Sequence, residues 1–514
     1  MTPDIWLTAA QQVLTPMALL YLTLGVLVGT VIGALPGLSA TMGVAILTPI
    51  TFYFAPTYGF AMLMGLWNAA IFAGGISAIL INTPGTPASI AQTFDGYSLY
   101  KQGKGGLALG VNVIYSFLGG VVSTICLIAF AEPIARFTVT FGPAEYAMLA
   151  LFGLSMMVAV ASDNVVKGLI VGMVGILLST VGLDPILGIK RFTFGNTDLL
   201  AGISFIPVMI GMFGIGEALY QMHSRRKAEE GAELAARKVN LRLGRIFPTA
   251  KEARQIAVPT AVAAAEGVVI GAIPATGGDI ASIISWGNAK RMSRHPEEYG
   301  KGSLEGLAVT STANNAVIGG AMTTMMTLGI PGDSVTAILI GSLTMYGMQP
   351  GIKMFTENAG FTAQIMLLML AANVVFLVLG LATAKLSARV LNVTQQTVWT
   401  AVSILCVVGS FALNNNFFDV LIMFIGGVLG YLFRIYGFPN GPFVLGLLLG
   451  GMVESNTRRA LVMSHGSWTT FVTRPISMVL FILIVLTFCW PIVKGRIDAR
   501  RAKKPAPVPQ EVTL

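Results

Sequence analysis

The dominant pattern along this chain is a series of long apolar runs separated by short polar stretches. The runs recur from about Leu14 to Trp490. Each is close to the roughly 20 residues that a helix needs to cross a bilayer. The pattern predicts an all-α integral membrane protein with about 12 transmembrane helices.

Four apolar runs are interrupted by Pro and Gly together with Ser, Thr, Asn or Asp. Pro removes a backbone donor and Gly unwinds easily, so each break exposes peptide groups that lipid cannot satisfy. A single break is often only a structural kink, but four similar breaks favour a transporter's binding site. The broken segments read GALPGLSAT from Gly33, NTPGTPAS from Asn82, GAIPATGGD from Gly271 and GIPGDS from Gly329.

The order of the breaks repeats, which predicts two inverted-repeat halves that contain broken, re-entrant helical hairpins. The register stays open, because Gly33–Ser39 matches Gly271–Gly277 while Pro84-Gly85-Thr86 also matches Pro274-Ala275-Thr276. We expect four regions: an N-terminal membrane half at 1–222, a basic cytoplasmic loop at 223–254, a C-terminal membrane half at 255–494 and a disordered cytoplasmic tail at 495–514.

Composition supports a membrane protein, because 54% of the 514 residues are hydrophobic and only 11% are charged. The mean hydropathy is +0.77. The net charge of +9 lies in short loops and the tail, so it indicates membrane orientation and no nucleic-acid partner. The three cysteines are widely spaced in apolar sequence, which argues against a disulfide framework or a metal cluster.

The breaks carry the candidate chemistry. A helix that restarts after a break presents free amide donors and a positive dipole end, both suited to a carboxylate. Helix ends with free carbonyls suit sodium, and Asp279 is a further candidate as a proton carrier. The expected solute-binding residues are Pro36, Gly37, Ser39, Thr41, Thr83, Gly85, Thr86, Ser89, Thr276, Gly277, Gly332 and Ser334. The expected cation ligands are Asn68, Asn82, Asn314, Asn315 and Asp333.

At these motifs the chain resembles the large membrane subunit, or permease, of the tripartite tricarboxylate transporters, over nearly its whole length. It departs from the family pattern at Thr310-Ser311, where Pro-Glu is usual, and at Pro274–Gly277, where Pro-Gly with a further Gly is frequent. The matching stretches are GALPGLSATMG from Gly33, GGISAILINTPGTPAS from Gly74, FDGYSLYKQGKGGLALG from Phe94, EGLAVTSTANNAVIGG from Glu305, LGIPGDSVTAILIGSL from Leu328 and RFTFG from Arg191.

The resemblance implies a multi-pass protein of the bacterial inner membrane that works with a small four-span membrane subunit and a periplasmic solute-binding protein. It also implies uptake of an organic carboxylate by symport, usually with sodium, and no cofactor other than that ion. The breaks themselves indicate an organic anion that moves with a cation and an elevator-like core at about 30–120 and 265–350. Together with the resemblance, they predict a secondary active transporter that imports an organic, citrate-like di- or tricarboxylate. The alternatives are a passive anion channel and a membrane-embedded enzyme; no nucleophile–base spacing supports an enzyme.

Overall fold

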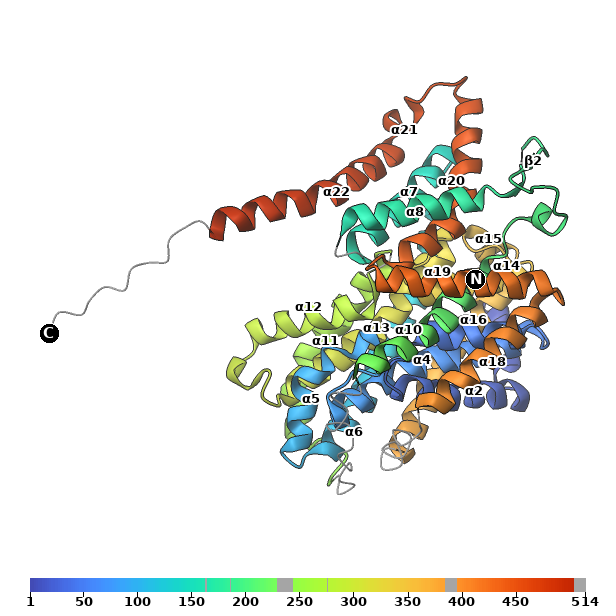
Figure 1. The fold of residues 1–514 in the computed structure, drawn as a ribbon. Coiled ribbons are helices and arrows are strands. Elements are labelled where there is room, and N and C mark those ends of the chain that lie inside the picture. The colour runs from blue at the N-terminus through green and yellow to red at the C-terminus, as the bar shows by residue number, and fades with distance from the viewer. Residues whose placement is uncertain (162–163, 185, 229–243, 275, 384–394, 503–514) are drawn as a thin grey trace.

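The computed structural model describes residues 1–161, 164–184, 186–228, 244–274, 276–383 and 395–502 (Figure 1). Helices dominate this part of the chain. The first half contains α1 (Pro3–Val13), α2 (Pro16–Ala34), α3 (Ala40–Thr51), α4 (Pro56–Ile81), α5 (Gln92–Lys101), α6 (Gly105–Thr138), α7 (Pro143–Ala161), α8 (Val165–Ser179), α9 (Phe205–Met209) and α10 (Gly216–Ala228).

The second half contains α11 (Ala250–Ala272), α12 (Gly277–Met292), α13 (Leu304–Leu328), α14 (Ser334–Met345), α15 (Ile352–Thr356), α16 (Ala359–Thr383), α18 (Gln395–Asn414), α19 (Phe417–Ile435), α20 (Asn440–Met463), α21 (Thr470–Thr473) and α22 (Pro475–Ala502). A π-helical segment, Ile210–Ile215, joins α9 to α10. A small antiparallel pair, β1 (Gly182–Leu183) and β2 (Lys190–Arg191), lies between α8 and α9.

The helical membrane fold predicted from the sequence is confirmed. Among the described residues, eight helices are long and apolar enough to cross a membrane, and five shorter apolar helices accompany them. The number of about 12 spans stays a prediction. Of the expected tail, residues 495–502 continue α22, which projects from the bundle (Figure 1). Residues 229–243 of the expected loop and 503–514 of the tail lie outside the described residues.

Glycine stripes allow the central helices to pack at very short distances. A Cβ atom added to Gly29 of α2 would lie 2.3 Å from the carbonyl oxygen of Leu66 in α4. In the second half, a Cβ on Gly271 of α11 would lie 2.4 Å from the carbonyl oxygen of Val317 in α13. Small residues permit such close helix approach in membranes. The pairs α2–α4 and α11–α13 thus share this close packing, and the register that aligns Gly33–Ser39 with Gly271–Gly277 stays a prediction.

The outer helices also pack in pairs that join the two halves of the chain. Helix α20 packs along α8, and α19 packs along the segment from α9 to α10. In each pair the helices run parallel: Gly211 lies against Met423, and further along Glu217 pairs with Arg434. Each pair thus combines one helix from each half of the chain.

The ends of these helices define the two sides of the membrane. Because the chain between α10 and α11 is strongly charged, the end of α10 and the start of α11 lie on one side, named here the basic side. On the opposite side, Asn416 at the start of α19 donates a hydrogen bond to Asp198 Oδ1 (3.2 Å). The Tyr53 hydroxyl, just after α3, donates to the carbonyl oxygen of Ala412 near the end of α18 (3.3 Å).

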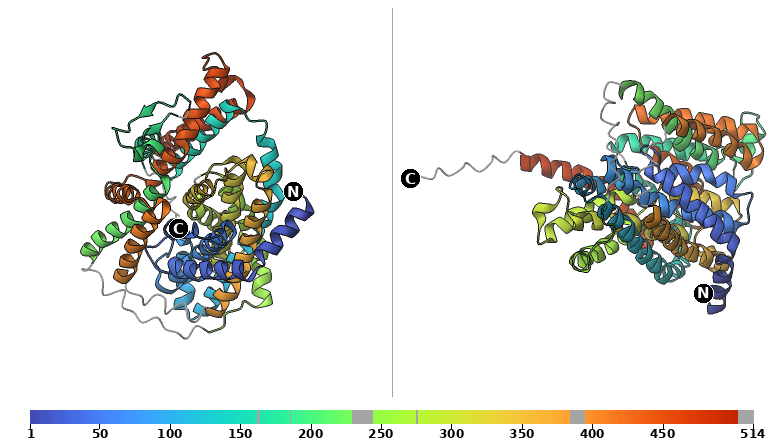
Figure 2. Two further views of the ribbon diagram at one scale, coloured as in Figure 1. Left: turned by 90° about the vertical axis from the view of Figure 1, so that its right-hand side faces the viewer. Right: turned by 90° about the horizontal axis from the view of Figure 1, so that it is seen from below.

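The two re-entrant hairpins therefore enter from opposite sides. The α2–α3 hairpin has its base beside Ala412 on the side opposite the basic loop, whereas the α11–α12 hairpin begins at Ala250 on the basic side. This is the arrangement that inverted repeats produce. The views in Figure 2 show α1 at the periphery of the bundle, and Met1 is anchored there through its ammonium group to Glu132 (2.6 Å).

Candidate functional site

A cavity of about 670 Å³ lies where the four breaks meet. Its volume falls within the range of roughly 300–1,000 Å³ that small-molecule sites occupy. One wall consists of residues from all four broken segments: Gly37 to Thr41, Pro84 to Ala88, Thr276 to Ile280, and Asp333 to Val335.

The first break ends α2 and starts α3. Gly37 adopts φ +93°, a conformation that glycine tolerates and other residues rarely adopt. Ser39 then caps α3, because its Oγ accepts a hydrogen bond from the backbone N–H of Met42 (3.1 Å). The tip therefore presents the start of a helix to the cavity.

The second break follows α4. Its chain folds back so that the N–H of Gly85 donates to the carbonyl oxygen of Gly74 (3.1 Å). Ser89 stabilises the turn by donating from Oγ to the carbonyl oxygen of Thr86 (2.8 Å). Thr86 Oγ1 is buried at the cavity and has no hydrogen-bond partner. This oxygen lies against α4, where a Cβ added to Gly74 would be 2.4 Å away, so a solute reaches it only if the turn shifts.

The third and fourth breaks lie side by side. Thr276 Oγ1 donates to the carbonyl oxygen of Ile273 (2.9 Å), and Gly277 adopts φ +67° as α12 begins. Asp333 caps α14 by accepting from the backbone N–H and the hydroxyl of Thr336 (2.8 and 2.7 Å). The backbone of Gly332 packs against that of Gly271.

The breaks from different halves also touch. Ser282 of α12 donates from Oγ to the carbonyl oxygen of Ala88 (3.1 Å). Gly85 lies against the carbonyl oxygen of Gly33, where an added Cβ would be only 2.0 Å away. The four segments consequently form one continuous surface.

Most of the expected solute-binding residues lie at this surface, and a few do not. Pro36, Ser89 and Gly332 belong to the breaks but lie behind the lining, whereas Thr83 is exposed at the turn after α4. Those that line the cavity are Gly37, Ser39, Thr41, Gly85, Thr86, Thr276, Gly277 and Ser334.

The expected cation ligands separate into three groups. Asp333 lines the cavity, as does Asp279, the expected proton carrier, and Asn314 Oδ1 lies directly behind Gly278 of the lining. Asn68 and Asn315 lie behind it, where Asn315 Nδ2 donates to the carbonyl oxygen of Asn68 (3.3 Å). Asn82 is exposed and ends α4 in a left-handed conformation. The structure thus separates Asn82 from the other candidates.

The buried amide group extends further than the sequence indicated. Asn373 of α16 donates from Nδ2 to Asn68 Oδ1 (3.4 Å). The Oδ1 atoms of Asn314, Asn315 and Asn373 are buried without a hydrogen-bond partner. Unpaired buried oxygens are costly unless a cation, a water molecule or a donor meets them. Among the described residues, no group of three or more His, Cys, Asp or Glu side chains could hold a metal ion.

The opposite wall of the cavity comes from helices outside the breaks, and the motif search missed it. Glu217 and Gln221 of α10 line this wall together with Arg434 of α19 and Asn440 of α20. Arg434 forms an ion pair with Glu217 and lies over the ring of Tyr220, 4.4 Å from its centroid. A sequence signal existed in part: Glu217 and Arg434 are ionisable residues within or at the end of candidate spans.

The position of this wall determines which side the cavity faces. Gln221 lies near the end of α10, and Arg434 is the second-last residue of α19. Both ends are on the basic side. On the opposite side, Gly341 of α14 packs against the ring of Phe205 and the side chain of Ile206. The cavity is therefore closer to the basic side, and apolar packing separates it from the other.

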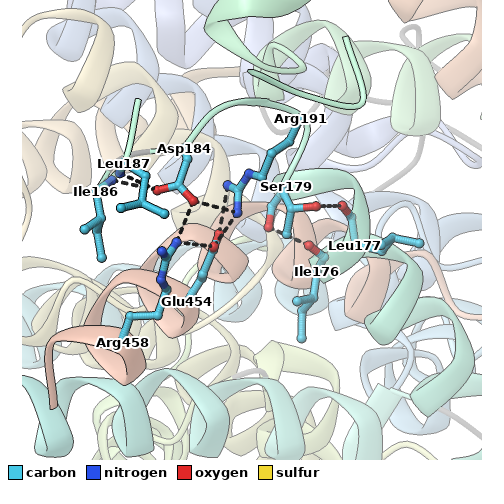
Figure 3. Close-up of polar contacts among 10 residues, drawn as sticks. Ile176, Leu177, Ser179, Asp184, Ile186, Leu187, Arg191, Glu454 and Arg458 are labelled. Atoms are coloured by element: carbon cyan, nitrogen blue, oxygen red, sulfur yellow. Dashed lines mark hydrogen bonds and ion pairs between the residues drawn. The ribbon is translucent and has the colours of Figure 1, made fainter. Parts of the chain in front are cut away.

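A charged cluster lies on the opposite side, away from the cavity. Figure 3 shows how the β1–β2 hairpin is attached to α20: Asp184 accepts a hydrogen bond from Arg458 Nη1 (2.6 Å), and Arg191 pairs with Glu454. Backbone N–H groups of the hairpin and the Arg458 guanidinium hold the pKa of Asp184 far below its ordinary value. The cluster fixes the hairpin to the helix.

The fold and the cavity define a multi-pass membrane transport protein. The family model described as "Tripartite tricarboxylate transporter TctA family" matches residues 19–445, and the chain belongs to this family. This confirms the resemblance found in the motifs.

Two relatives come from Agrobacterium vitis. The "Uncharacterized 52.8 kDa protein in TAR-I ttuC' 3'region" is 34% identical over 467 residues, which cover 91% of each chain. The "Uncharacterized protein in TAR-II ttuC' 3'region" is 32% identical over 235 residues, which cover 45% of this chain and 97% of the relative. No solved structure shows significant similarity to this chain.

Proposed function

We propose that this chain is the subunit of a secondary active transporter that imports an organic di- or tricarboxylate. The observation that carries the proposal is the cavity that has residues of all four helix breaks along one wall. Helices α3, α12 and α14 all begin at residues of its lining, so three positive dipole ends surround one space. Free N–H groups suit the several oxygen atoms of a polycarboxylate.

Coupling to a cation, with sodium as the first choice, agrees with the chemistry behind the cavity. The amide Nδ2 atoms of Asn314 and Asn315 donate to the carbonyl oxygens of Ile71 (3.5 Å) and Asn68 (3.3 Å), which leaves both Oδ1 atoms buried and unpaired. Neutral oxygens of this kind suit a hard monovalent cation. Asp333 at the adjoining helix start would add a carboxylate ligand, and Asp279 is the alternative carrier if protons drive uptake.

The basic side is the cytoplasmic side in this proposal, because lysine and arginine accumulate in cytoplasmic loops. The membrane is then the bacterial inner membrane, and the cavity faces the cytoplasm. A periplasmic solute-binding protein would deliver the carboxylate from the opposite side, and a small four-span membrane subunit would complete the assembly. The tripartite organisation in the family's name supports two associated subunits, and these two partners are our proposal for them.

An elevator-like movement is the proposed mechanism. The helices that carry the breaks form one tightly packed unit through the α2–α4, α6–α13 and α11–α13 contacts. Helices α10 and α19 form the other wall of the cavity. Movement of the first unit against the second would transfer the bound solute between sides without dismantling its site.

Uptake into proteoliposomes tests the proposal. The chain is reconstituted with a small four-span subunit in the membrane and a solute-binding protein outside the vesicles, and uptake of labelled citrate, malate and tartrate is followed. We expect uptake of at least one anion that requires an inward sodium gradient. Uptake driven by the proton gradient alone would make protons the coupling ion, with Asp279 as their carrier. No uptake of citrate, malate or tartrate would overturn the carboxylate assignment.

A further inference from the structure

A charged pair on the wall opposite the breaks is not accounted for by the helix-end chemistry. Among the described residues that line the cavity, Arg434 is the one cation, and Glu217 is its partner. They come from α19 and α10, which carry no break. The helix breaks therefore explain the solute contacts on one wall only.

The pair is only partly protected from solvent. The side chain of Glu217 is 12% exposed, whereas that of Arg434 is 45% exposed. Gln221 supports the acid by donating from Nε2 to Glu217 Oε1 (2.7 Å). Glu217 is thus held in place by two neighbours, while Arg434 lines the cavity and is nearly half exposed.

The geometry points to an anion-exchange site: Arg434 binds a carboxylate group of the solute at the basic side, and Glu217 competes for the same guanidinium. A guanidinium binds one carboxylate in a two-pronged arrangement, and a solute carboxylate offers the same two oxygens as Glu217. The incoming anion weakens the Arg434–Glu217 contact, and the return of Glu217 displaces the anion. This inference rests on the proposed function.

The position of Gln221 joins this exchange to the first break. A Cβ on Gly37 would lie 3.1 Å from Gln221 Nε2, so the amide that holds Glu217 also rests against the tip between α2 and α3. A shift of that tip moves Gln221, and Gln221 orients the competing acid. Solute release at Arg434 is therefore connected to the position of the breaks.

Opposite effects of two substitutions test the exchange site. Glu217→Gln removes the competitor while keeping a similar shape, so we expect the apparent affinity for the anion on the basic side to rise about fivefold and the turnover rate to fall. Arg434→Gln removes the binding group, so the apparent affinity falls about tenfold. Arg434→Lys keeps the positive charge but lacks the planar guanidinium, so we expect its apparent affinity to lie between those of wild type and Arg434→Gln.

The measurement uses the chain with its partner subunits in proteoliposomes, and labelled citrate, malate and tartrate as probes. Efflux and exchange from the basic side give affinity and rate separately. Lys353→Gln is the matched control, because Lys353 forms an exposed ion pair with Glu357 (3.8 Å) remote from the cavity lining. It leaves both quantities unchanged.

The outcomes are distinguishable. If Glu217→Gln and Arg434→Gln both weaken affinity and lower the melting temperature together, the pair is a structural bridge and the exchange site is overturned. If the wild type transports an anion and the variants have the same apparent affinity and turnover rate, the exchange site is overturned but the proposed function is not. If wild type transports none of the probes, the proposed function fails and this inference fails with it.

Discussion

Ser282 on α12 and the backbone of Ala88 are joined by a hydrogen bond of 3.1 Å, although 194 positions separate them. This bond links the third break to the second, and hence one half of the chain to the other. Within the first half, the backbone of Gly85 packs directly on Gly33, which joins the second break to the first. The solute surface exists only where the two halves meet.

Gly85→Ala should disturb that junction. The new Cβ would lie 2.0 Å from the Gly33 carbonyl oxygen, so the first two breaks must separate at a cost of about 1–3 kcal/mol. We expect uptake to fall about tenfold while the protein still reaches the membrane. Gly287→Ala on α12 is the matched control, because a Cβ there meets no atom within 4 Å. Equal uptake by both variants would contradict the close packing.

Asp95 should contribute strongly to stability. Its Oδ1 accepts hydrogen bonds from the backbone N–H groups of Gly300, Gly302 and Ser303 (2.8, 3.1 and 2.8 Å), and Oδ2 accepts from Trp286 Nε1 (2.8 Å). Asp95→Asn replaces the charged acceptor of these bonds by a neutral amide, so we expect the free energy of unfolding to fall by about 2–3 kcal/mol.

Thermal unfolding in detergent, followed by tryptophan fluorescence, measures the effect of Asp95→Asn. Asp4→Asn is the control because Asp4 is exposed in the first turn of α1. A melting temperature that is unchanged in both variants would show that the carboxylate does not anchor the loop at 300–303.

The breaks could be predicted because their cause is local. Pro and Gly interrupt a helix wherever they occur, and Ser39 or Asp333 identifies the new helix start from sequence alone. The opposite wall could not be predicted, because Arg434 meets Glu217 only through the packing of α19 on α10. No local pattern relates those two positions.

Burial also separated residues that the sequence treated alike. Asn82 and Asn315 both belong to polar stretches of the sequence. Asn82, however, ends α4 in an exposed turn, whereas Asn315 is completely buried. Helix α13 shows the converse. The polar run Thr310–Asn315 lowers the hydropathy of α13, so this helix is not among the apolar candidate spans. Helix α13 is nevertheless buried along most of its length. Tertiary contacts decide both cases.

The outer hairpin should loosen in acid. The Arg458 guanidinium and hairpin N–H groups depress the pKa of Asp184, so its contribution to stability is complete above about pH 4, the ordinary aspartate range. It is lost as the pH falls further toward the depressed value. We expect Asp184→Asn to remove this acid dependence and to lower stability at pH 7.

Protease cleavage within residues 182–194, compared between pH 7 and about pH 2 with an acid-active protease, detects the loosening. Asp198→Asn serves as the control because Asp198 belongs to the same external region but, among the described residues, accepts a side-chain hydrogen bond from the uncharged Asn416. If wild type and Asp184→Asn show the same pH dependence, the hairpin is not held by this carboxylate.

A disulfide between the two packed units should stop transport if the breaks move as one body. Gly341 on α14 packs against Phe205 at the start of α9, and a Cβ on Gly341 would lie 3.1 Å from the Phe205 ring. The pair Gly341→Cys and Phe205→Cys, in a chain whose three native cysteines are replaced by alanine, should crosslink under mild oxidation. The disulfide joins α14 to the start of α9 on the side of the membrane opposite the basic side.

Oxidation should abolish uptake by this double variant, reduction should restore it, and each single-cysteine variant should be insensitive to both. Binding of the transported anion from the basic side should persist in the locked form, because the crosslink lies outside the cavity lining. Normal uptake by fully crosslinked protein would exclude movement of α14 against α9. A local gate at the hairpin tips would then have to provide access, since the Gly37 and Gly277 turns are the flexible backbone positions that remain free.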